Sequence, residues 1–188
     1  MNAFVIVENR PFSLDQIIKD HSDYLSDDWV LHKHAPQIRT GHEYNAYLTQ
    51  ISFWNDLIKY DRVLIFQHDS KLLRHGIEEF LQYDFIGAPI HHIKFPAMNG
   101  GLSLRNPRAM IKCLNDRAWS SALGNEDIYF CHQLAKLGGN LPSKEIASMF
   151  SVESIFSLGS LGIHQIESYL TNEQCRQILT QYETINTQ

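Results

Sequence analysis

The sequence has few cysteines and no long apolar run. Its three cysteines, Cys113, Cys131 and Cys175, are far apart and form no CxxC pair, which excludes a disulfide framework and a structural zinc knot. No segment approaches the about 20 apolar residues that a transmembrane helix needs. The start, MNAFVIVENR, lacks the basic region and the length of a signal peptide. We therefore expect a cytoplasmic protein, whose contact with a membrane, if any, is peripheral and at its inner face.

Basic clusters and the best-known nucleotide-binding loops are also missing. The net charge is −5, with 16 Lys and Arg against 21 Asp and Glu, so nucleic acid is not an expected partner. The sequence has no G-x-G-x-x-G, Walker or G-x-S-x-G motif. These absences disfavour a Rossmann dehydrogenase, a P-loop enzyme and a serine hydrolase.

Apolar runs alternate with amphipathic stretches along most of the chain. The runs predict strands at 3–8, 29–34, 62–67, 84–89 and 100–105. The amphipathic stretches predict helices after Ser13, over 43–59, 77–82, 107–115, 126–137 and 141–150, and after Thr171. The expected N-terminal caps are capping boxes at Ser13 with Gln16 and at Thr171 with Gln174, and single caps at Asn106, Asn125 and Ser143. This alternation predicts an α/β fold, a single domain with a mostly parallel central sheet flanked by helices.

Three segments form the ends of predicted strands. They are Glu8-Asn9-Arg10 and Gln67-His68-Asp69, which are rich in polar residues, and Gly87-Ala88-Pro89. Ligands of such sheets bind at the carboxyl ends of the strands. We therefore expect these segments to border one crevice.

Asp69 and His164 are the candidate metal ligands. A carboxylate after an apolar strand suits Mg²⁺ or Mn²⁺, and imidazole with carboxylate suits Mn²⁺. The alternative for Asp69 is that Asp69-Ser70 closes a turn, as these residue types often do. The alternative for His164 is a histidine with no role beyond its own packing.

Two further segments have an ordinary structural explanation and a functional one. Asn99-Gly100 is typical of a hairpin turn, and Gly100-Gly101 also permits close approach of the main chain to a ligand. Glu126 and Asp127 follow Asn125 at a predicted helix start, where the helix dipole favours acids. The functional alternative is a general base. Taken by themselves, these two segments favour the structural explanations, a hairpin turn at Asn99-Gly100 and a helix start stabilised by acids at Glu126 and Asp127.

The order of four segments resembles the GT-A glycosyltransferases. YDRVLIFQHDS (60–70) is similar to the strand that ends in their D-x-D metal motif, with Gln67 in place of the first acid. NGGLSLRNPRAM (99–110) is similar to their glycine pair before a strand and helix. NEDIYF (125–130) and GIHQ (162–165) are similar to their acidic segment and late histidine. The resemblance implies a GT-A-like, Rossmann-like domain.

A bacterial family of glycosyltransferase-like domains of unknown function is a closer match. Its typical runs resemble Val5 to Arg10, Leu48 to Trp54, Val63 to Ser70, Tyr83 to Ile90, Asn99 to Arg105, Glu126 to Phe130 and Phe150 to Glu153. The family usually has Thr in place of His68 and Trp in place of Ile90. The resemblance covers about residues 1–170 as the catalytic domain. It leaves 171–188 as a C-terminal helix packed on that domain or extending from it.

The resemblance implies a hexosyltransferase-like enzyme of polysaccharide biosynthesis. The expected reaction moves a sugar from a UDP- or GDP-sugar to a hydroxyl of a glycan or other acceptor, with Mn²⁺ or Mg²⁺ bound by Asp69 and His164. Asp127 is the expected general base, and Glu126 is the second candidate for this role. Attack from the face opposite the leaving group would invert the anomeric configuration of the transferred sugar. The implied donor-binding residues are Glu8, Arg10, Asn45, Gln67, His68, Asn99, Gly100 and Gly101.

Two other functions stay open. A non-catalytic nucleotide- or glycan-binding domain could keep the fold, and Gln67 in place of an acid is its best support. A metal-dependent phosphohydrolase or nuclease needs several carboxylates clustered at strand ends, and the sequence offers too few.

Overall fold

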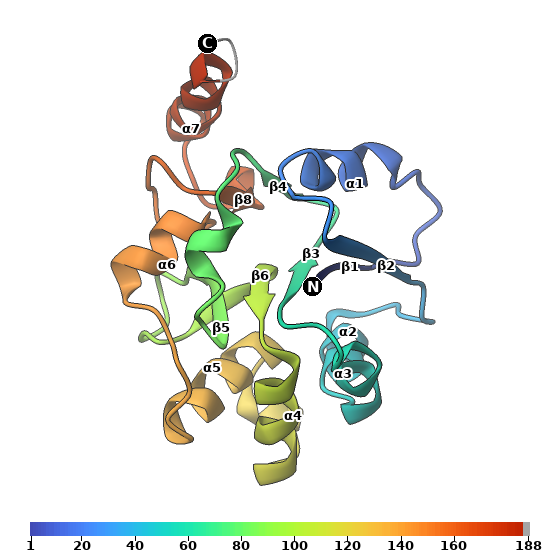
Figure 1. The fold of residues 1–188 in the computed structure, drawn as a ribbon. Coiled ribbons are helices and arrows are strands. Elements are labelled where there is room, and N and C mark those ends of the chain that lie inside the picture. The colour runs from blue at the N-terminus through green and yellow to red at the C-terminus, as the bar shows by residue number, and fades with distance from the viewer. Residues whose placement is uncertain (186–188) are drawn as a thin grey trace.

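A five-stranded sheet forms the centre of the protein (Figure 1). The computed structural model describes residues 1–185, and the strand order in this sheet is β2-β1-β3-β6-β5. The strands are β1 (Asn2–Val7), β2 (Trp29–His34), β3 (Val63–Phe66), β5 (Phe85–Pro89) and β6 (Met98–Arg105). β1 is parallel to β2 and β3, while β6 is antiparallel to both β3 and β5. Every strand but β6 therefore points the same way, and the predicted mostly parallel α/β class is confirmed.

Helices surround the sheet and bury the central strand β3 and its neighbour β1 completely. They are α1 (Asp15–Ser22), α2 (Gly41–Leu48), α3 (Ile51–Leu57), α4 (Pro107–Asp116), α5 (Glu126–Lys136) and α6 (Lys144–Phe150). In Figure 1, α2 to α5 gather at one end of the sheet, while α1 lies beside β4 and α6 against β5. Every residue of β1 and β3 is buried, which explains their unbroken apolar runs.

A second, three-stranded sheet was not predicted. It has the order β4-β8-β7, from β4 (Ser70–Leu72), β8 (Gly162–His164) and β7 (Ser151–Val152). Such short strands show no period-two pattern that a sequence could reveal. The antiparallel pairing sets Ser70 opposite His164 and so brings the residues that follow β3 to the late histidine.

Two helix predictions were wrong in detail. Residues 43–59 form two helices, because the chain breaks between α2 and α3 and the indole of Trp54 donates to the carbonyl of Leu48 at 2.7 Å. The predicted capping box at Ser13 is absent, since α1 begins after Leu14 without a side-chain cap. Thr40 and Glu43 form an unpredicted capping box at α2.

A predicted hairpin turn and a predicted helix cap were also wrong. Asn99-Gly100 lies inside β6 and is no hairpin turn. The side chain of Asn125 makes no capping bond to α5, and instead Asn45 Oδ1 accepts from the backbone N–H of Glu126 at 3.3 Å. The predicted caps at Asn106, at Ser143 and at Thr171 with Gln174 are confirmed.

The C-terminal helix α7 (Asn172–Ile185) projects from the body at the top of Figure 1. Its Cys175 and Ile178 are buried in a small apolar cluster with Leu73, Val152, Ile163 and Ile166. Of the segment predicted as 171–188, residues 186–188 lie outside the described residues. Short 3-10 helices complete the fold at η1 (Ile77–Phe80), η2 (Ser121–Leu123) and η3 (Ile166–Ser168). Across residues 1–185, none of the helices has the length and apolar character needed to cross a membrane.

Candidate active site

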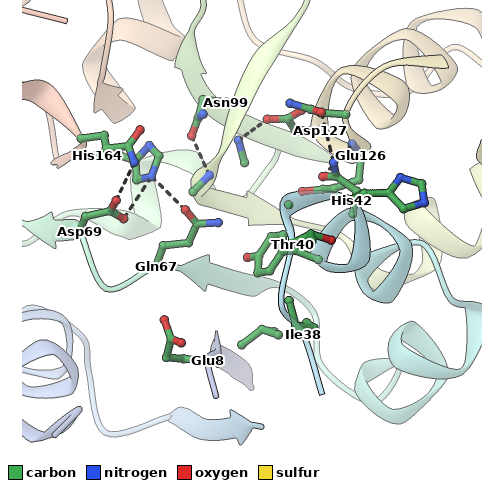
Figure 2. Close-up of a pocket in the computed structure, with 18 of the residues that line it drawn as sticks. Glu8, Ile38, Thr40, His42, Gln67, Asp69, Asn99, Glu126, Asp127 and His164 are labelled. Atoms are coloured by element: carbon green, nitrogen blue, oxygen red, sulfur yellow. Dashed lines mark hydrogen bonds and ion pairs between the residues drawn. The ribbon is translucent and has the colours of Figure 1, made fainter. Parts of the chain in front are cut away.

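A cavity of about 850 Å³ lies at the carboxyl ends of β1 and β3. Its volume is within the range of small-molecule sites. All twelve residues that the sequence proposed for the site line it: Glu8, Arg10, Asn45, Gln67, His68, Asp69, Asn99, Gly100, Gly101, Glu126, Asp127 and His164. Figure 2 shows Gln67, Asp69 and His164 on one side, Glu126 and Asp127 on the other, and Asn99 between them.

The segment Gly87-Ala88-Pro89 does not border this cavity, so that prediction was wrong. β6 lies between β5 and β3, and it shields the end of β5 from the site. A Cβ on Gly87 would lie 2.0 Å from the carbonyl oxygen of Asn99, so this glycine allows two strands to approach closely.

Asp69 and His164 face each other across the two paired strands. Asp69 Oδ1 lies 3.3 Å from His164 Nε2, and Asp69 Oδ2 accepts from the Gln165 side chain at 2.8 Å. Apart from this contact with His164 and one with His68 Nδ1 at 3.7 Å, the buried Oδ1 accepts no hydrogen bond from residues 1–185. Ser70 closes the turn after β3 through its hydroxyl, which donates to the Gln67 carbonyl at 2.7 Å. The carboxylate of Asp69 is therefore left to face the cavity.

Glu153 holds the other side of the His164 ring. Its Oε1 lies 3.2 Å from His164 Nδ1, and both side chains are almost completely buried. Burial lowers the pKa of His164, but the hydrogen bonds and charges of Asp69 and Glu153 outweigh it and raise this pKa to about 9. Burial likewise raises the pKa of Asp69, but His164 outweighs it and lowers that pKa to about 2. His164 is therefore protonated at neutral pH and would have to lose a proton before Nε2 could bind a metal ion.

The donor atoms fit a divalent cation that also has ligands from a substrate. His164 Nε2 lies 3.1 Å from Gln67 Oε1 and 3.3 Å from Asp69 Oδ1. Two ligands about 2.1 Å from one ion and at right angles lie about 3.0 Å apart, so each pair matches an edge of an octahedron. Within residues 1–185 no group of three or more His, Cys, Asp or Glu could hold a metal ion. The protein alone therefore supplies only part of a coordination shell.

Glu8, Arg10 and His68 form a second charged group at the cavity wall. Glu8 accepts from the Arg10 side chain at Nε (2.9 Å) and at Nη2. This pairing lowers the pKa of Glu8. Arg10 Nη2 also lies 2.7 Å from His68 Nδ1, and its side chain is 53% exposed against 7% for Glu8. Glu8 thus holds an accessible guanidinium at the cavity.

The backbone of Gly100 and Gly101 is fully engaged within the protein. The N–H of Gly100 donates to Asp127 Oδ2 at 2.9 Å, and that of Gly101 donates to Asn99 Oδ1 at 2.7 Å. The carbonyl of Gly101 accepts from the Gln67 N–H at 2.9 Å. These groups therefore position site side chains, and neither glycine has a positive φ.

Side chains fill the space that a Cβ would need at both glycines. A Cβ on Gly101 would lie 2.2 Å from His164 Nε2. A Cβ on Gly100 would lie 2.6 Å from Arg105 Nη2 and 2.8 Å from Glu126 Oε1. The absence of side chains at the two glycines thus allows His164 and a buried ion pair of Arg105 with Glu126 to pack against β6.

That ion pair joins Arg105 and Glu126 under the floor of the site. Arg105 Nη1 donates to Glu126 Oε2 at 2.6 Å and Nη2 to Oε1 at 2.9 Å, and Arg105 is fully buried. The guanidinium packs over the Phe85 ring at 4.7 Å and also donates to the Gly100 carbonyl at 3.3 Å. Glu126 binds a buried guanidinium through both carboxylate oxygens, and this positive charge opposes uptake of a proton, so the role of Glu126 here is structural.

Asp127 is the buried carboxylate with the most strongly raised pKa. Burial, reinforced by the charge of Glu126, raises the pKa of Asp127 to about 7. Its Oδ1 accepts from the N–H of Ile128 at 2.7 Å, and its Oδ2 accepts from Gly100. A carboxylate that titrates near pH 7 suits general-base chemistry.

A family model matches residues 30–165, and its description is "Protein of unknown function (DUF5672)". The chain belongs to this family. No curated protein matches the sequence of this DUF5672 chain.

Two solved glycosyltransferases share the fold. The apo form of GlyE from Streptococcus pneumoniae TIGR4 has a TM-score of 0.52 and 10% identity, over 96% of this chain and 59% of that chain. A glycosyltransferase involved in the glycosylation of the major capsid of PBCV-1 has a TM-score of 0.52 and 9% identity, over 95% of this chain and 98% of that chain. These likenesses support the GT-A-like fold of the DUF5672 chain.

Sequence reasoning missed three residues of the site in this DUF5672 chain. Glu153 and Arg105 were recognised only as the last residues of matching segments, and Arg105 also as the end of a predicted strand. Tyr44 lines the cavity beside Gln67, and burial raises its pKa. A buried charge at Arg105 or Glu153 has no local sequence signal, because its partner belongs to another element, 21 residues away for Arg105 and 11 for Glu153.

Proposed function

We propose that this chain is a glycosyltransferase that moves a sugar from a nucleoside diphosphate donor to an acceptor hydroxyl. The observation that carries the proposal is the placing of Asp69 with His164 on one side of a single cavity and of Asp127 on the other. One side suits the leaving diphosphate and the other suits proton removal from the acceptor. The shared fold of two glycosyltransferases supports the proposal.

Asp69 and His164 would hold a divalent cation, with Gln67 as a third contact, and the donor diphosphate would bind beside that cation. A divalent cation, Mn²⁺ or Mg²⁺, would neutralise the charge that develops on the leaving diphosphate. Arg10 and His68 would contact the nucleotide, with Glu8 fixing the guanidinium of Arg10. Asn99 would contact the donor sugar, while Gly100 and Gly101 would support the site by admitting His164 and the Arg105–Glu126 pair against β6.

Asp127 would act as the general base. It would take the proton of the acceptor hydroxyl while that oxygen forms a bond to the anomeric carbon of the donor sugar. The bond from this carbon to the phosphate oxygen breaks, and the nucleoside diphosphate leaves with the electron pair. Attack from the face opposite the diphosphate would invert the anomeric configuration. Glu126 is a poorer base because Arg105 occupies it, and Asn45 acts here chiefly by capping the helix that carries both acids.

A donor panel tests the proposal. UDP-, GDP-, CMP- and dTDP-sugars are added with and without Mn²⁺ while thermal unfolding is followed. A ligand that binds only the folded state raises the melting temperature by mass action. We expect one nucleotide class, with UDP and GDP foremost, to raise it more when Mn²⁺ is present.

The Asp127→Asn variant separates catalysis from binding. We expect it to keep the shift caused by the donor and to lose donor hydrolysis and transfer, because an amide cannot accept the proton. Asp56→Asn is the matched control, since Asp56 is exposed and lies outside the cavity lining. Full hydrolysis by Asp127→Asn would exclude Asp127 as the base.

A non-catalytic nucleotide- or glycan-binding domain is the second candidate. It is favoured by Gln67, which stands where the D-x-D motif has an acid, and by the incomplete set of metal ligands in residues 1–185. Donor binding by the wild-type chain without any hydrolysis or transfer would support it. For the enzyme, by contrast, we further propose that the acceptor is a glycan of a surface polysaccharide. We also propose that the enzyme works at the inner face of the membrane.

A further inference from the structure

A second, smaller cavity adjoins the main one on the far side of Asp127. It measures about 200 Å³. The residues that line this small cavity and not the main one are Ile90, His92, Ile93, Ile128 and Ser154. Asn99, Asn125, Asp127, Glu153 and Tyr169 line both cavities. Asp127 therefore stands where the two spaces meet.

The position of Asp127 at this junction is fixed by backbone donors from two elements. Gly100, in β6, donates to Oδ2, and Ile128, in α5, donates to Oδ1. The carboxylate thus cannot swing away from either cavity without losing a hydrogen bond. A group in the small cavity and a group in the main cavity can both lie next to it.

The walls of the small cavity suit a neutral ring that carries hydroxyls. Ile90, Ile93 and Ile128 give the otherwise polar wall an aliphatic part, and Tyr169, 49% exposed, adds an aromatic ring at the border of both cavities. None of the described residues that line it is Lys or Arg, whereas two of them, Asp127 and Glu153, are acids. An anionic ligand would therefore be repelled, while a sugar can offer its C–H face to the apolar wall and its hydroxyls to the polar groups.

A tertiary hydrogen bond supports the shape of the small cavity. The backbone N–H of His91 donates to Ser154 Oγ at 3.1 Å and ties the segment after β5 to the segment after β7. The volume is below the about 300–1,000 Å³ of drug-sized sites, which leaves room for one ring and not for an oligosaccharide.

We propose that the small cavity binds the terminal, uncharged sugar of the acceptor, with one of its hydroxyls beside Asp127. The assignment rests on the proposed function. The hydroxyl proton passes to Asp127, and the hydroxyl oxygen bonds the anomeric carbon of the donor in the main cavity as its bond to the diphosphate breaks.

Saturation-transfer NMR with methyl hexopyranosides tests the assignment. These uncharged single rings are added to the wild-type chain, to Ile93→Trp and to Ile128→Trp. Each Trp fills the small cavity from a different element. Leu158→Trp is the matched control, because Leu158 is 50% exposed and lies outside both linings. We expect at least one methyl hexopyranoside to bind the wild type and the control, and to bind both cavity variants about tenfold more weakly or worse.

The donor panel, run on the same variants, distinguishes failure of this inference from failure of the proposed function. Unchanged sugar binding in both cavity variants overturns the inference, as does tighter binding of a hexose phosphate than of the uncharged rings. Donor binding and hydrolysis that persist in those cases leave the proposed function standing. Loss of sugar binding in the variants, with no donor binding by the wild type, supports the small cavity as a sugar site and overturns the proposed function.

Discussion

The protonation of Asp127 sets the expected pH profile of the reaction. Its pKa is raised to about 7 by burial and by the charge of Glu126. Below this pH the carboxyl is protonated and cannot accept a proton, so kcat/KM for transfer should rise with pH through about 7 and then level off. Initial rates across that range, at saturating Mn²⁺, measure the profile. A rate that is independent of pH between about 6 and 8 would contradict a base of this pKa.

Glu153 should position His164 for metal binding. It accepts at Nδ1, which leaves Nε2 directed at Asp69 and Gln67. Such partners of a metal-binding histidine are worth about 10–100-fold in metal affinity, so Glu153→Leu should weaken Mn²⁺ binding by that factor. Glu153→Gln keeps a hydrogen-bond acceptor and should lose less.

Electron paramagnetic resonance of free Mn²⁺ measures this affinity without any turnover. Glu78→Leu serves as the control, because Glu78 is exposed and lies outside the cavity lining. Equal Mn²⁺ affinity in the wild type, Glu153→Leu and Glu153→Gln would show that Glu153 does not support the histidine.

Residues at the ends of predicted strands were the part of the site that the sequence could predict. Asp69 and Arg10 follow apolar runs, and the strand-end rule places such residues at one edge of a sheet. Arg105 and Glu153 escaped because their importance depends on a partner across the fold. Asn45 was predicted to face the nucleotide, and its contact with the Glu126 N–H shows an additional structural use that no local pattern reveals.

At the scale of elements, β6 must pass close to His164. A methyl group at Gly101 would meet the imidazole at 2.2 Å, and that ring is enclosed by Glu153 and Gln67. We therefore expect Gly101→Ala to displace His164 and to weaken Mn²⁺ binding about tenfold or more. In Gly41→Ala, by contrast, the added methyl has no neighbour within 4 Å, so binding should be unchanged.

Calorimetry with Mn²⁺ on both glycine variants, alongside their thermal unfolding, checks this prediction. Wild-type affinity in a folded Gly101→Ala protein would show that the ring has space to move.

Long or well-capped elements were predictable, and short ones were not. The strand at 29–34 and the helix after Asn106 were confirmed because burial and capping act within a few residues. β4, β7 and β8 are too short for periodicity, and their pairing depends on residues far along the chain. The break between α2 and α3 depends on the tertiary contact of Trp54, which no 3.6-residue pattern encodes.

At the scale of the whole molecule, the sequence predicted the class and not the topology. Alternating strands and helices indicate a parallel sheet, but nothing local marks β6 as the reversed strand. Because β6 runs in the opposite direction, its first residues, among them Asn99 and Gly101, lie at the edge of the sheet where β1 and β3 end.

The attachment of α7 is a second whole-molecule feature that a mutation can test. Ile178 is fully buried in the small cluster, whereas the neighbouring Leu179 is 39% exposed. Ile178→Ala should lower the free energy of unfolding by about 2–5 kcal/mol, and Leu179→Ala should change it little. Urea unfolding of both variants measures the difference. Equal stabilities would mean that α7 contributes little to the folded body.

The pairing of β4 with β8 has a kinetic consequence. Asp69 and Gln165, which flank this pairing, are 96 positions apart in the chain. Contacts of such long range close late, because a long loop must be ordered before they form. During synthesis β4 therefore waits as an unpaired edge until residues 162–164 have left the ribosome. The proposed site for a metal ion and a nucleotide, which includes His164, is likewise completed only at that point.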